Sequence, residues 1–238
     1  QVTFRLLTLH PNEIKLDKHH FYWHQFISGQ IYAEQVLTTQ ALPYLFRDYH
    51  EMPIIEKKAL KLSHGRILDV GCGAGSHSVY LKNLGYDIKA IDVSEGAIVV
   101  TKHRGIMNAR KLDLLDETAQ YDTILMLMNG TGIFQTIKST PDYLTHLKSL
   151  LSPRGQILID SSDIKYMYEG QEEHYLLDTS DKYYGELDYY LSYHGDNETP
   201  IKWLYLDFFK LKTLSNSVGL TCELILHGPH HDYLAKLS

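Results

Sequence analysis

The sequence has few of the features that mark secreted, membrane-spanning or repetitive proteins. Its 238 residues include only two cysteines and seven prolines, and two cysteines are too few for a disulfide framework. No apolar run approaches the roughly 18 residues that a membrane helix needs. Residues 1–11 lack the basic start and apolar centre of a secretory signal, and we find no internal repeat or low-complexity tract. These absences predict one globular chain in the reducing cytoplasm, with Cys72 and Cys222 as free thiols.

Basic charge is also scarce. The formal net charge is −6, and residues 162–202 carry ten acidic side chains against three lysines, so the rest of the chain is close to neutral. The same segment, which we call the acidic insertion, holds eight of the 18 tyrosines. Binding to nucleic acid needs a basic stripe facing the phosphates. The charge distribution therefore disfavours a nucleic-acid partner.

Short apolar runs alternate with helix-like segments through the middle of the chain. We expect strands at 66–70, 86–92, 108–113, 121–128 and 156–160, and helices at 76–84, 95–103 and 142–151. Strands that alternate with helices predict an α/β fold with a doubly wound, mostly parallel sheet. Ligands of such folds bind beyond the carboxyl ends of the strands.

The two ends of the chain have different patterns. Aromatic and aliphatic residues recur at helical spacing in 19–46, and 52–62 is a second short helix, so we expect residues 1–62 to be helical. Residues 187–193 look like a strand in the acidic insertion. The chain closes with an expected helix at 203–217, a strand at 220–227 and an antiparallel return at 232–237.

A glycine-rich loop follows the first expected parallel strand. Gly71, Gly73 and Gly75 alternate, and Asp69 stands two residues ahead of them. Glycines at such a turn let a ligand approach the backbone and bring unpaired N–H groups toward it. Asp92 closes the next strand, where an acid can accept hydrogen bonds from ribose hydroxyls. The alternation differs from the G-x-G-x-x-G spacing of dinucleotide sites, which disfavours NAD.

The string D-x-G-x-G-x-G at residues 69–75 resembles the hallmark of class I S-adenosylmethionine-dependent methyltransferases, and the resemblance runs from about Arg66 to the C-terminus. It implies a Rossmann-like, seven-stranded sheet with an antiparallel C-terminal hairpin, and S-adenosylmethionine as cofactor. It also implies an N-terminal helical lid at 1–62, and a core at 63–238 that carries a substrate cover at 162–202. The cofactor-binding residues that it implies are Asp69, Gly71, Cys72, Gly73, Gly75, Asp92, Val93, Asp113, Leu114 and Met128.

The methyl acceptor is less constrained by the sequence. Asn129-Gly130-Thr131-Gly132 departs from the Asn/Asp-Pro-Pro-Tyr/Phe string that resembles base-amino methyltransferases, so a nucleobase amine is disfavoured. The acids and tyrosines of the insertion favour a small cationic or amine-bearing molecule, unless the acids only face solvent and the tyrosines only pack. Alternatives are a protein or RNA acceptor, or a non-catalytic S-adenosylmethionine-binding protein. The candidate substrate-binding residues are Tyr22, Asn129, Tyr189 and Tyr193.

Histidines supply the remaining candidates. His194 is a candidate general base for an acceptor that is protonated at neutral pH, with a solvated loop position as its alternative. His20 and His24 lie one helical turn apart, and His230 and His231 are adjacent. Neither pair has a fixed third ligand, so we expect no metal site. Trp23 joins Tyr22 as a candidate to close the cofactor site from the lid, with ordinary core packing as the alternative.

Overall fold

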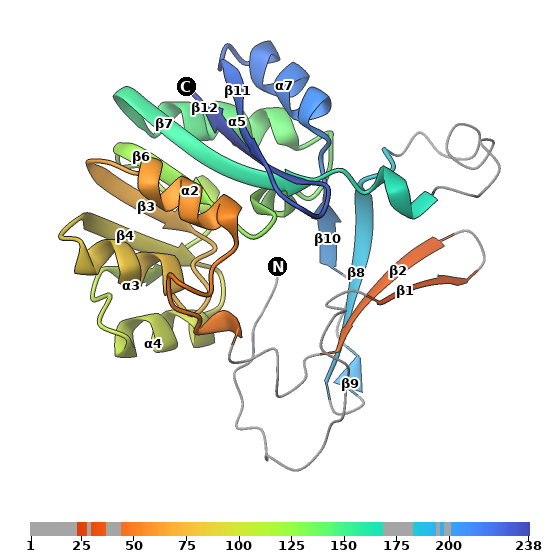
Figure 1. The fold of residues 1–238 in the computed structure, drawn as a ribbon, viewed down its shortest axis with the longest axis horizontal. Coiled ribbons are helices and arrows are strands. Elements are labelled where there is room, and N and C mark those ends of the chain that lie inside the picture. Colours follow the sequence, from red (N-terminus) through yellow and green to blue (C-terminus); the bar gives the residue numbers. More distant parts are fainter. Residues whose placement is uncertain (1–22, 28–29, 37–43, 169–182, 194–195, 198–200) are drawn as a thin grey trace.

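A seven-stranded sheet forms the centre of the molecule (Figure 1), with the strand order β11-β12-β7-β6-β3-β4-β5. The computed structural model describes residues 23–27, 30–36, 44–168, 183–193, 196–197 and 201–238. Five strands run parallel: β3 (Arg66–Val70), β4 (Asp87–Asp92), β5 (Ala109–Lys111), β6 (Tyr121–Met126) and β7 (Leu151–Ser162). The antiparallel pair β11 (Cys222–His227) and β12 (Asp232–Leu237) completes the sheet. The expected doubly wound fold with its C-terminal hairpin is confirmed.

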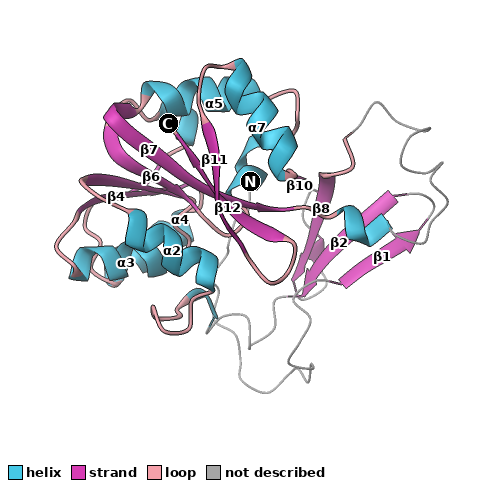
Figure 2. Ribbon diagram, turned by 45° about the horizontal axis from the view of Figure 1, so that its top comes forward, coloured by secondary structure: helices cyan, strands magenta, loops and turns pink. Residues whose placement is uncertain are grey.

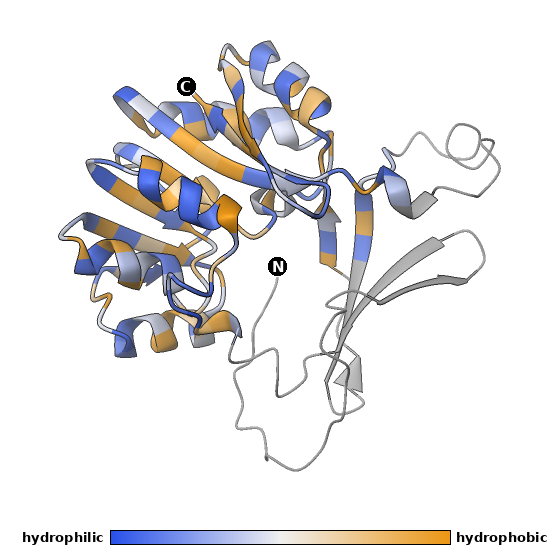
Figure 3. Cartoon of the chain, viewed as in Figure 1, coloured by the Kyte–Doolittle hydropathy of each residue, from blue (hydrophilic) through white to orange (hydrophobic). Residues whose placement is uncertain are grey.

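Helices cover both faces of this sheet (Figure 2): α2 and α3 lie on one face, and α5 and α7 on the other. Neighbouring residues of a strand point to opposite faces, so Leu158 of β7 packs in the cluster of α2, whereas Ile157 packs in the cluster of α5. Hydrophobic residues accordingly follow the central strands in Figure 3. The helices are α2 (Ile54–Leu62), α3 (Ser76–Asn83), α4 (Glu95–His103), α5 (Thr140–Ser149) and α7 (Phe208–Ser217).

Local signals in the sequence set several helix ends. The Ser94 side chain accepts a hydrogen bond from the Ala97 N–H at 3.3 Å and caps α4, as its position predicts. Gly85 ends the turn after α3 with φ +90°, a left-handed conformation that glycine adopts without a Cβ clash. In the part of the chain that the structure describes, no helix is long and apolar enough to cross a membrane.

A second sheet stands beside the first. Its path is β1 (Trp23–Ile27), β2 (Gln30–Val36), β8 (Glu186–Tyr193) and β10 (Ile201–Leu204), with the short β9 (Asp196–Asn197) paired to β8. β2 runs parallel to β8, whereas β1 pairs antiparallel with β2 and β10 antiparallel with β8. The strand expected at 187–193 is therefore confirmed. The acidic insertion and the N-terminal segment thus share one sheet.

The helix expected over residues 19–46 is wrong at residues 23–27 and 30–36, whereas residues 44–45 are helical. Residues 23–27 and 30–36 are strands joined across Ser28-Gly29, a dipeptide typical of turns. Aromatic and β-branched residues suit a pleated strand as well as a helix. The pairing of β2 with β8 decides between them, and no sequence window contains both strands. The lid role of this segment stays a prediction.

The helix expected at 203–217 begins later than its hydrophobic pattern suggests. Trp203 lies in β10, paired with Leu187 of β8. The helix α7 starts after Asp207, whose carboxylate accepts a hydrogen bond from the Lys210 N–H at 2.9 Å. An N-cap aspartate ends the preceding extended segment and satisfies an otherwise unpaired donor of the first turn. This cap, rather than the apolar spacing, sets the start of the helix.

Candidate functional site

The glycine loop connects β3 to α3 at the carboxyl edge of the parallel strands. Gly71, Gly73 and Gly75 have φ values of +70°, +54° and +80°, which residues with a Cβ rarely adopt. At Gly75 an added Cβ would also lie 2.9 Å from the Thr101 side chain. At Gly73 the same Cβ would meet nothing within 4 Å. The loop is therefore tight against α4 at Gly75 and has open space beside Gly73.

Most donors of this loop are already paired. The N–H groups of Gly71 and Cys72 donate to the Ile91 carbonyl at 2.9 and 3.1 Å, and the Gly75 N–H donates to the Cys72 carbonyl at 2.8 Å. The Gly73 N–H donates to Asp92 Oδ2 at 2.9 Å. At these four positions the expected unpaired N–H groups are not found. A ligand would meet the loop mainly by close approach to its backbone rather than as an anion in a ring of donors.

Asp92 ends β4 directly beside the loop. Its Oδ2 accepts from Gly73 and its Oδ1 accepts from the Ser94 N–H at 2.8 Å. Each carboxylate oxygen can accept two hydrogen bonds, so these contacts orient the group and leave acceptor capacity on both oxygens. Burial raises the pKa of Asp92, against the effect of the backbone hydrogen bonds. The loop and the acid thus form one rigid unit.

Two further members of the motif, Asp69 and Cys72, are buried beneath the loop, and their cofactor-binding role stays a prediction. Asp69 is buried and accepts from Ser78 Oγ at 2.6 Å, which attaches the start of α3 to β3. Burial raises the pKa of the Asp69 carboxyl. Cys72 packs in the apolar cluster of α4 with Ile98, and burial raises the pKa of its thiol. Both side chains point into the protein interior and fix the ends of the loop against β3, α3 and α4.

Asp113 lies next along the same edge. It precedes the 3₁₀ turn η1 (Leu114–Asp116), and its Oδ1 accepts from the Leu115 N–H at 3.0 Å. Leu114 is buried in the core. The Leu112 N–H donates to the Asp92 carbonyl at 3.0 Å. This bond holds the segments of Asp92 and Asp113 together.

The chain leaves β6 through a left-handed turn. Met128 and Asn129 have φ values of +67° and +62°, and η2 (Gly130–Phe134) follows. Asp160 of β7 accepts from the Met128 N–H at 3.1 Å through Oδ2 and from the Gly130 N–H at 2.9 Å through Oδ1. Burial raises the pKa of Asp160 to about 7. Sequence reasoning missed Asp160, although this buried acid lies two residues before the end of β7.

The same turn contacts the second sheet. The Asn129 amide donates to the Leu204 carbonyl at 3.3 Å and accepts from Ser161 Oγ at 3.0 Å. Thr131 Oγ1 donates to the same Leu204 carbonyl at 3.0 Å. Beside them the Trp203 ring lies so close to Gly132 that a Cβ there would stand 2.1 Å from the ring. Strand β10 therefore rests on the turn that follows β6.

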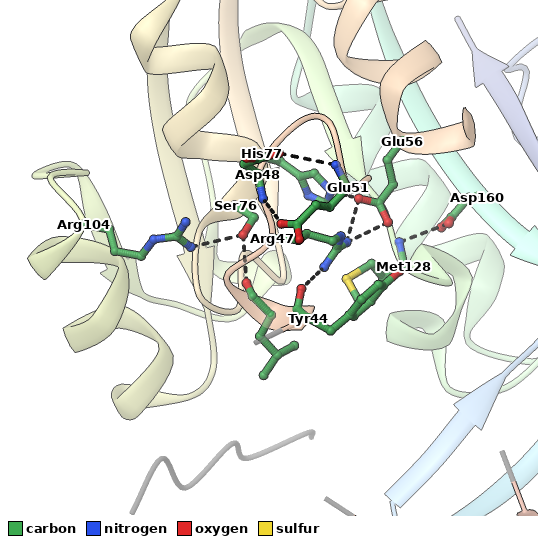
Figure 4. A network of polar contacts seen from close by, with 11 residues as sticks. Tyr44, Arg47, Asp48, Glu51, Glu56, Ser76, His77, Arg104, Met128 and Asp160 are labelled. Carbon is green, nitrogen blue, oxygen red and sulfur yellow. Dashed lines mark hydrogen bonds and ion pairs between the residues drawn. The ribbon is translucent and has the colours of Figure 1, made fainter. Parts of the chain in front are cut away.

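A buried ionic network anchors residues 44–47 behind the glycine loop (Figure 4). Arg47 Nη2 lies 2.6 Å from both carboxylate oxygens of Glu56, and His77 Nε2 lies 2.7 Å from Glu56 Oε2. Burial opposes ionisation of Glu56, but the His77 contact and the charge of Arg47 lower its pKa. Ser76 Oγ donates to the Leu45 carbonyl at 2.8 Å. No local sequence pattern predicts this network, because its members lie on separate elements.

A second anchor comes from α4. Arg104 at its C-terminal end donates to the Ala74 carbonyl at 2.7 Å and to Ser76 Oγ at 3.1 Å. Its guanidinium also lies over the Phe46 ring at 5.2 Å. The glycine loop is therefore held between α4 on one side and residues 44–47 on the other.

The structure brings most of the predicted cofactor-binding residues to one edge of the sheet, including Val93 next to Asp92. Tyr22, His20 and His194 lie outside the described residues. For Trp23, His24, Tyr189 and Tyr193 only the strand positions in β1 and β8 are described. His231 stacks on the Tyr166 ring at 4.5 Å. Within the described ranges, no group of three His, Cys, Asp or Glu side chains could hold a metal ion.

Comparison with known proteins adds to this geometry. A family profile described as "Methyltransferase domain" matches residues 40–207. A solved SAM-dependent methyltransferase from Bacteroides fragilis, in complex with S-adenosyl-L-homocysteine, is 42% identical, with a TM-score of 0.75 and coverage of 83% of this chain and 81% of that chain. The CcbJ methyltransferase of Streptomyces caelestis shares the fold at 14% identity, with a TM-score of 0.55 and coverage of 78% and 89%.

Curated relatives match over shorter stretches. The ubiquinone biosynthesis O-methyltransferase of Rickettsia conorii is 25% identical over 122 residues, which cover 47% of this chain and 41% of that protein. The mitochondrial ubiquinone biosynthesis O-methyltransferase of Schizosaccharomyces pombe is 27% identical over 103 residues, which cover 40% and 37%. The chain thus spans about two fifths of the length of the curated relatives it matches.

Proposed function

The chain belongs to the class I S-adenosylmethionine-dependent methyltransferases, within the methyltransferase-domain family, and from this membership we propose that it methylates a small-molecule acceptor. The observation that carries the proposal is the edge formed by the glycine loop, Asp92 and Asp113. The relative from Bacteroides fragilis, solved with the demethylated cofactor product, supports the same cofactor here.

The described residues fit S-adenosylmethionine at this edge. Open space beside Gly73 admits a ligand against the backbone, and Asp92 retains acceptor capacity for two ribose hydroxyls. Asp113 is half-buried beside it and would meet the adenine edge. Met128 and Asn129 would stand where the cofactor and the acceptor meet. Bound S-adenosylmethionine supplies a methyl group that its positively charged sulfur activates for displacement.

The work of the chain is then to bring the acceptor into line with that methyl group. Holding two reacting groups close and aligned contributes roughly 7–11 kcal/mol to such a step. A general base is needed only for an acceptor that is protonated at neutral pH, and His194 stays our candidate for that role. The second sheet would provide the acceptor side, because β10 rests on the turn at Asn129.

The favoured acceptor class is cationic or amine-bearing. The acidic insertion carries an excess of acid over base, which attracts cations. Asp163 of this segment accepts from the Tyr184 hydroxyl at 2.8 Å, and Glu186 accepts from the Ile137 N–H at 2.7 Å. These two acids therefore serve the fold. We assign the binding role to the acidic insertion as a whole, together with Tyr189 and Tyr193 of β8. The proposed compartment is the cytoplasm, where two free thiols persist.

Transfer of labelled methyl from S-adenosylmethionine tests this function. The pure protein is incubated with the labelled cofactor and, separately, with a metabolite extract, total RNA and cell protein. We expect label in a small molecule and none in the polymers. Label in RNA or protein would replace the proposed acceptor class. Tight cofactor binding without turnover on any fraction would point to a non-catalytic binding protein, and affinity for NAD alone would overturn the cofactor.

Replacing Tyr189 and Tyr190 with leucine tests the binding role of the insertion. Leucine keeps an apolar side chain and removes the ring and hydroxyl, so we expect weaker acceptor binding and a higher KM for the acceptor. A matched control replaces Tyr166 with leucine. Tyr166 lies on η3 (Lys165–Tyr168), is exposed, and its ring stacks on that of His231. Unchanged turnover in the β8 variant, with the fold preserved, would contradict the binding role.

A further inference from the structure

The turn after β6 contains two consecutive residues in an unfavourable backbone conformation. Met128 and Asn129 both have positive φ and neither is glycine. Such residues cost of order 1–3 kcal/mol each and persist only where surrounding contacts enforce them. Contacts from a neighbouring group must therefore hold this turn in place.

Asp160 is the enforcing group. Its two carboxylate oxygens accept from the N–H groups on either side of Asn129, those of Met128 and Gly130. The carboxyl is buried near the C-terminal end of β7, two residues before Ser162. The turn has no slack, because a Cβ on Gly130 would lie 2.6 Å from the Met126 Cβ and 3.3 Å from the Ile159 side chain. One side chain therefore fixes three consecutive residues of the turn.

The held turn is also the support of β10. Asn129 and Thr131 both donate to the Leu204 carbonyl. Ser161, next to Asp160, donates to Asn129 and receives the Leu206 N–H at 2.9 Å. The chain leaving the second sheet at residues 204–206 is thus bonded to the same turn. Because the turn is bonded to residues 204–206, a shift of the turn would change the position of the cofactor edge relative to the second sheet.

We propose that Asp160 is a positioning residue for methyl transfer: its carboxylate holds the Met128–Asn129 turn so that the cofactor edge and the acceptor side carried by β10 stay in register. This inference rests on the proposed function. Reacting groups must be aligned to a fraction of an ångström, so loosening the turn lowers the rate of the chemical step even where both ligands still bind.

The variant Asp160→Asn tests the proposal at nearly constant shape. At pH 8 the side chain of Asp160, whose pKa is about 7, is a carboxylate. The amide keeps one neutral acceptor and turns an N–H₂ toward the second backbone donor, so one hydrogen bond is lost and the other loses its charge. We expect kcat to fall about ten- to hundredfold, the ratio that corresponds to the loss of one hydrogen bond to a charged group. The dissociation constant for S-adenosylmethionine, fixed mainly at Asp92 and Asp113, is expected to change less than about threefold.

Glu117→Gln is the matched control. Glu117 is also a buried carboxylate that accepts two backbone N–H groups, those of Thr118 and Ala119 at 3.1 and 3.0 Å. It lies between η1 and β6, where its Oε2 also pairs with Lys89 Nζ at 2.5 Å, and its described partners are all outside the turn. Glu117→Gln is expected to lower the melting temperature and to leave kcat unchanged. Equal losses of kcat in both variants, in proportion to their melting temperatures, would reduce Asp160 to a structural role and overturn the proposal.

Thr131→Val keeps the test open if Asp160→Asn does not fold. Thr131 is completely buried, so it cannot touch an acceptor. Valine preserves its shape while removing the hydrogen bonds to Leu204 and Ser161. We expect a fall in kcat with cofactor affinity retained, and an unchanged kcat would overturn the proposal.

If the wild-type protein methylates no acceptor, the proposed function fails. Trp203 emission, measured in a Trp23→Phe background, then decides: a shift in Asp160→Asn and none in Glu117→Gln supports the positioning role, and no shift overturns it.

Discussion

Carboxylates at strand ends do most of the local work in this protein. Asp92 and Asp160 each accept two backbone N–H groups from the loops that face them, and Asp113 accepts one. Backbone donors at the ends of strands have lost their ladder partners, and an acid there satisfies them. The same three side chains therefore anchor the loops at the carboxyl edge of the sheet.

The Asp160 carboxyl should make stability depend on pH. Folding raises its pKa from 3.8 to about 7, so between these values the folded chain binds more protons there than the unfolded chain does. The contribution of Asp160 to the free energy of unfolding is complete below about pH 4 and is lost as the pH rises toward 7, by up to about 1.4 kcal/mol per pH unit. Urea unfolding of the wild type and Asp160→Asn from pH 5 to 7.5 measures this.

The difference between the two proteins isolates the group. Glu56 and His77 are the charged side chains that act on Asp160, and both are present in the variant. We expect the stability of the wild type relative to Asp160→Asn to decrease steadily with rising pH. A difference that is constant with pH would show that the Asp160 carboxyl is not protonated in this range.

Two substitutions of Asp92 distinguish its role in ligand binding from its structural role. In Asp92→Ala, S-adenosylmethionine should lose roughly 1.5–3 kcal/mol of binding free energy, because hydrogen bonds to a charged group disappear. Asp92→Asn keeps an acceptor for the Gly73 or Ser94 N–H and should lose less. Calorimetric titration of folded variants gives both values. Equal affinity in the wild type and Asp92→Ala would mean that the ribose is bound elsewhere.

At the scale of elements, close packing joins the two sheets. Gly132 leaves room for the Trp203 ring, and a Cβ there would overlap it. Gly132→Ala should therefore reduce the free energy of unfolding by about 1–3 kcal/mol, the usual cost of overpacking. Gly132→Ala combined with Trp203→Leu should recover part of this loss. Thermal unfolding of the two single variants and the double variant measures the coupling, and additive effects would show that the two residues do not interfere.

The Arg47–Glu56–His77 network should stabilise the attachment of residues 44–47 to helices α2 and α3. Arg47→Met leaves a buried Glu56 with His77 alone, and breaking a buried ion pair in this way typically costs about 3–5 kcal/mol. Arg47→Met combined with Glu56→Leu removes both charges and should cost less. Chemical denaturation distinguishes the two variants. A loss below about 0.5 kcal/mol for Arg47→Met would show that water replaces the guanidinium.

Elements whose signals are local could be predicted from the sequence. The strand 66–70, the glycine loop, the Ser94 cap and the antiparallel return at 232–237 are all fixed by neighbouring residues, and the structure confirms them. The strands β1 and β2 could not be predicted, because their state depends on β8 far along the chain. The ionic network at Arg47 and the packing of Trp203 on Gly132 likewise join segments that no local pattern relates.

At the scale of the whole molecule, charge is divided between two regions. The acidic insertion carries more than the entire net negative charge, and the remainder is close to neutral. If the acceptor is a cation, this field should raise its rate of encounter. We expect kcat/KM for a cationic acceptor to fall as salt is raised from about 0.02 to 0.3 M, because screening shortens the range of the field. A neutral analogue is the control, and equal salt dependence would contradict electrostatic attraction.

The parallel pairing of β2 with β8 has a consequence for the order of folding. Residues 32–36 align with residues 188–192, so about 150 residues of chain must be closed into a loop before this ladder can form. Contacts of such high sequence separation pay their loop-closure entropy first and form slowly. In the large sheet the strands β3, β4 and β5 pair with close neighbours in sequence, whereas the second sheet needs both distant segments. We therefore expect the cofactor edge to be assembled early and the second sheet to form late, so that a folding intermediate would already bind cofactor before it can select an acceptor.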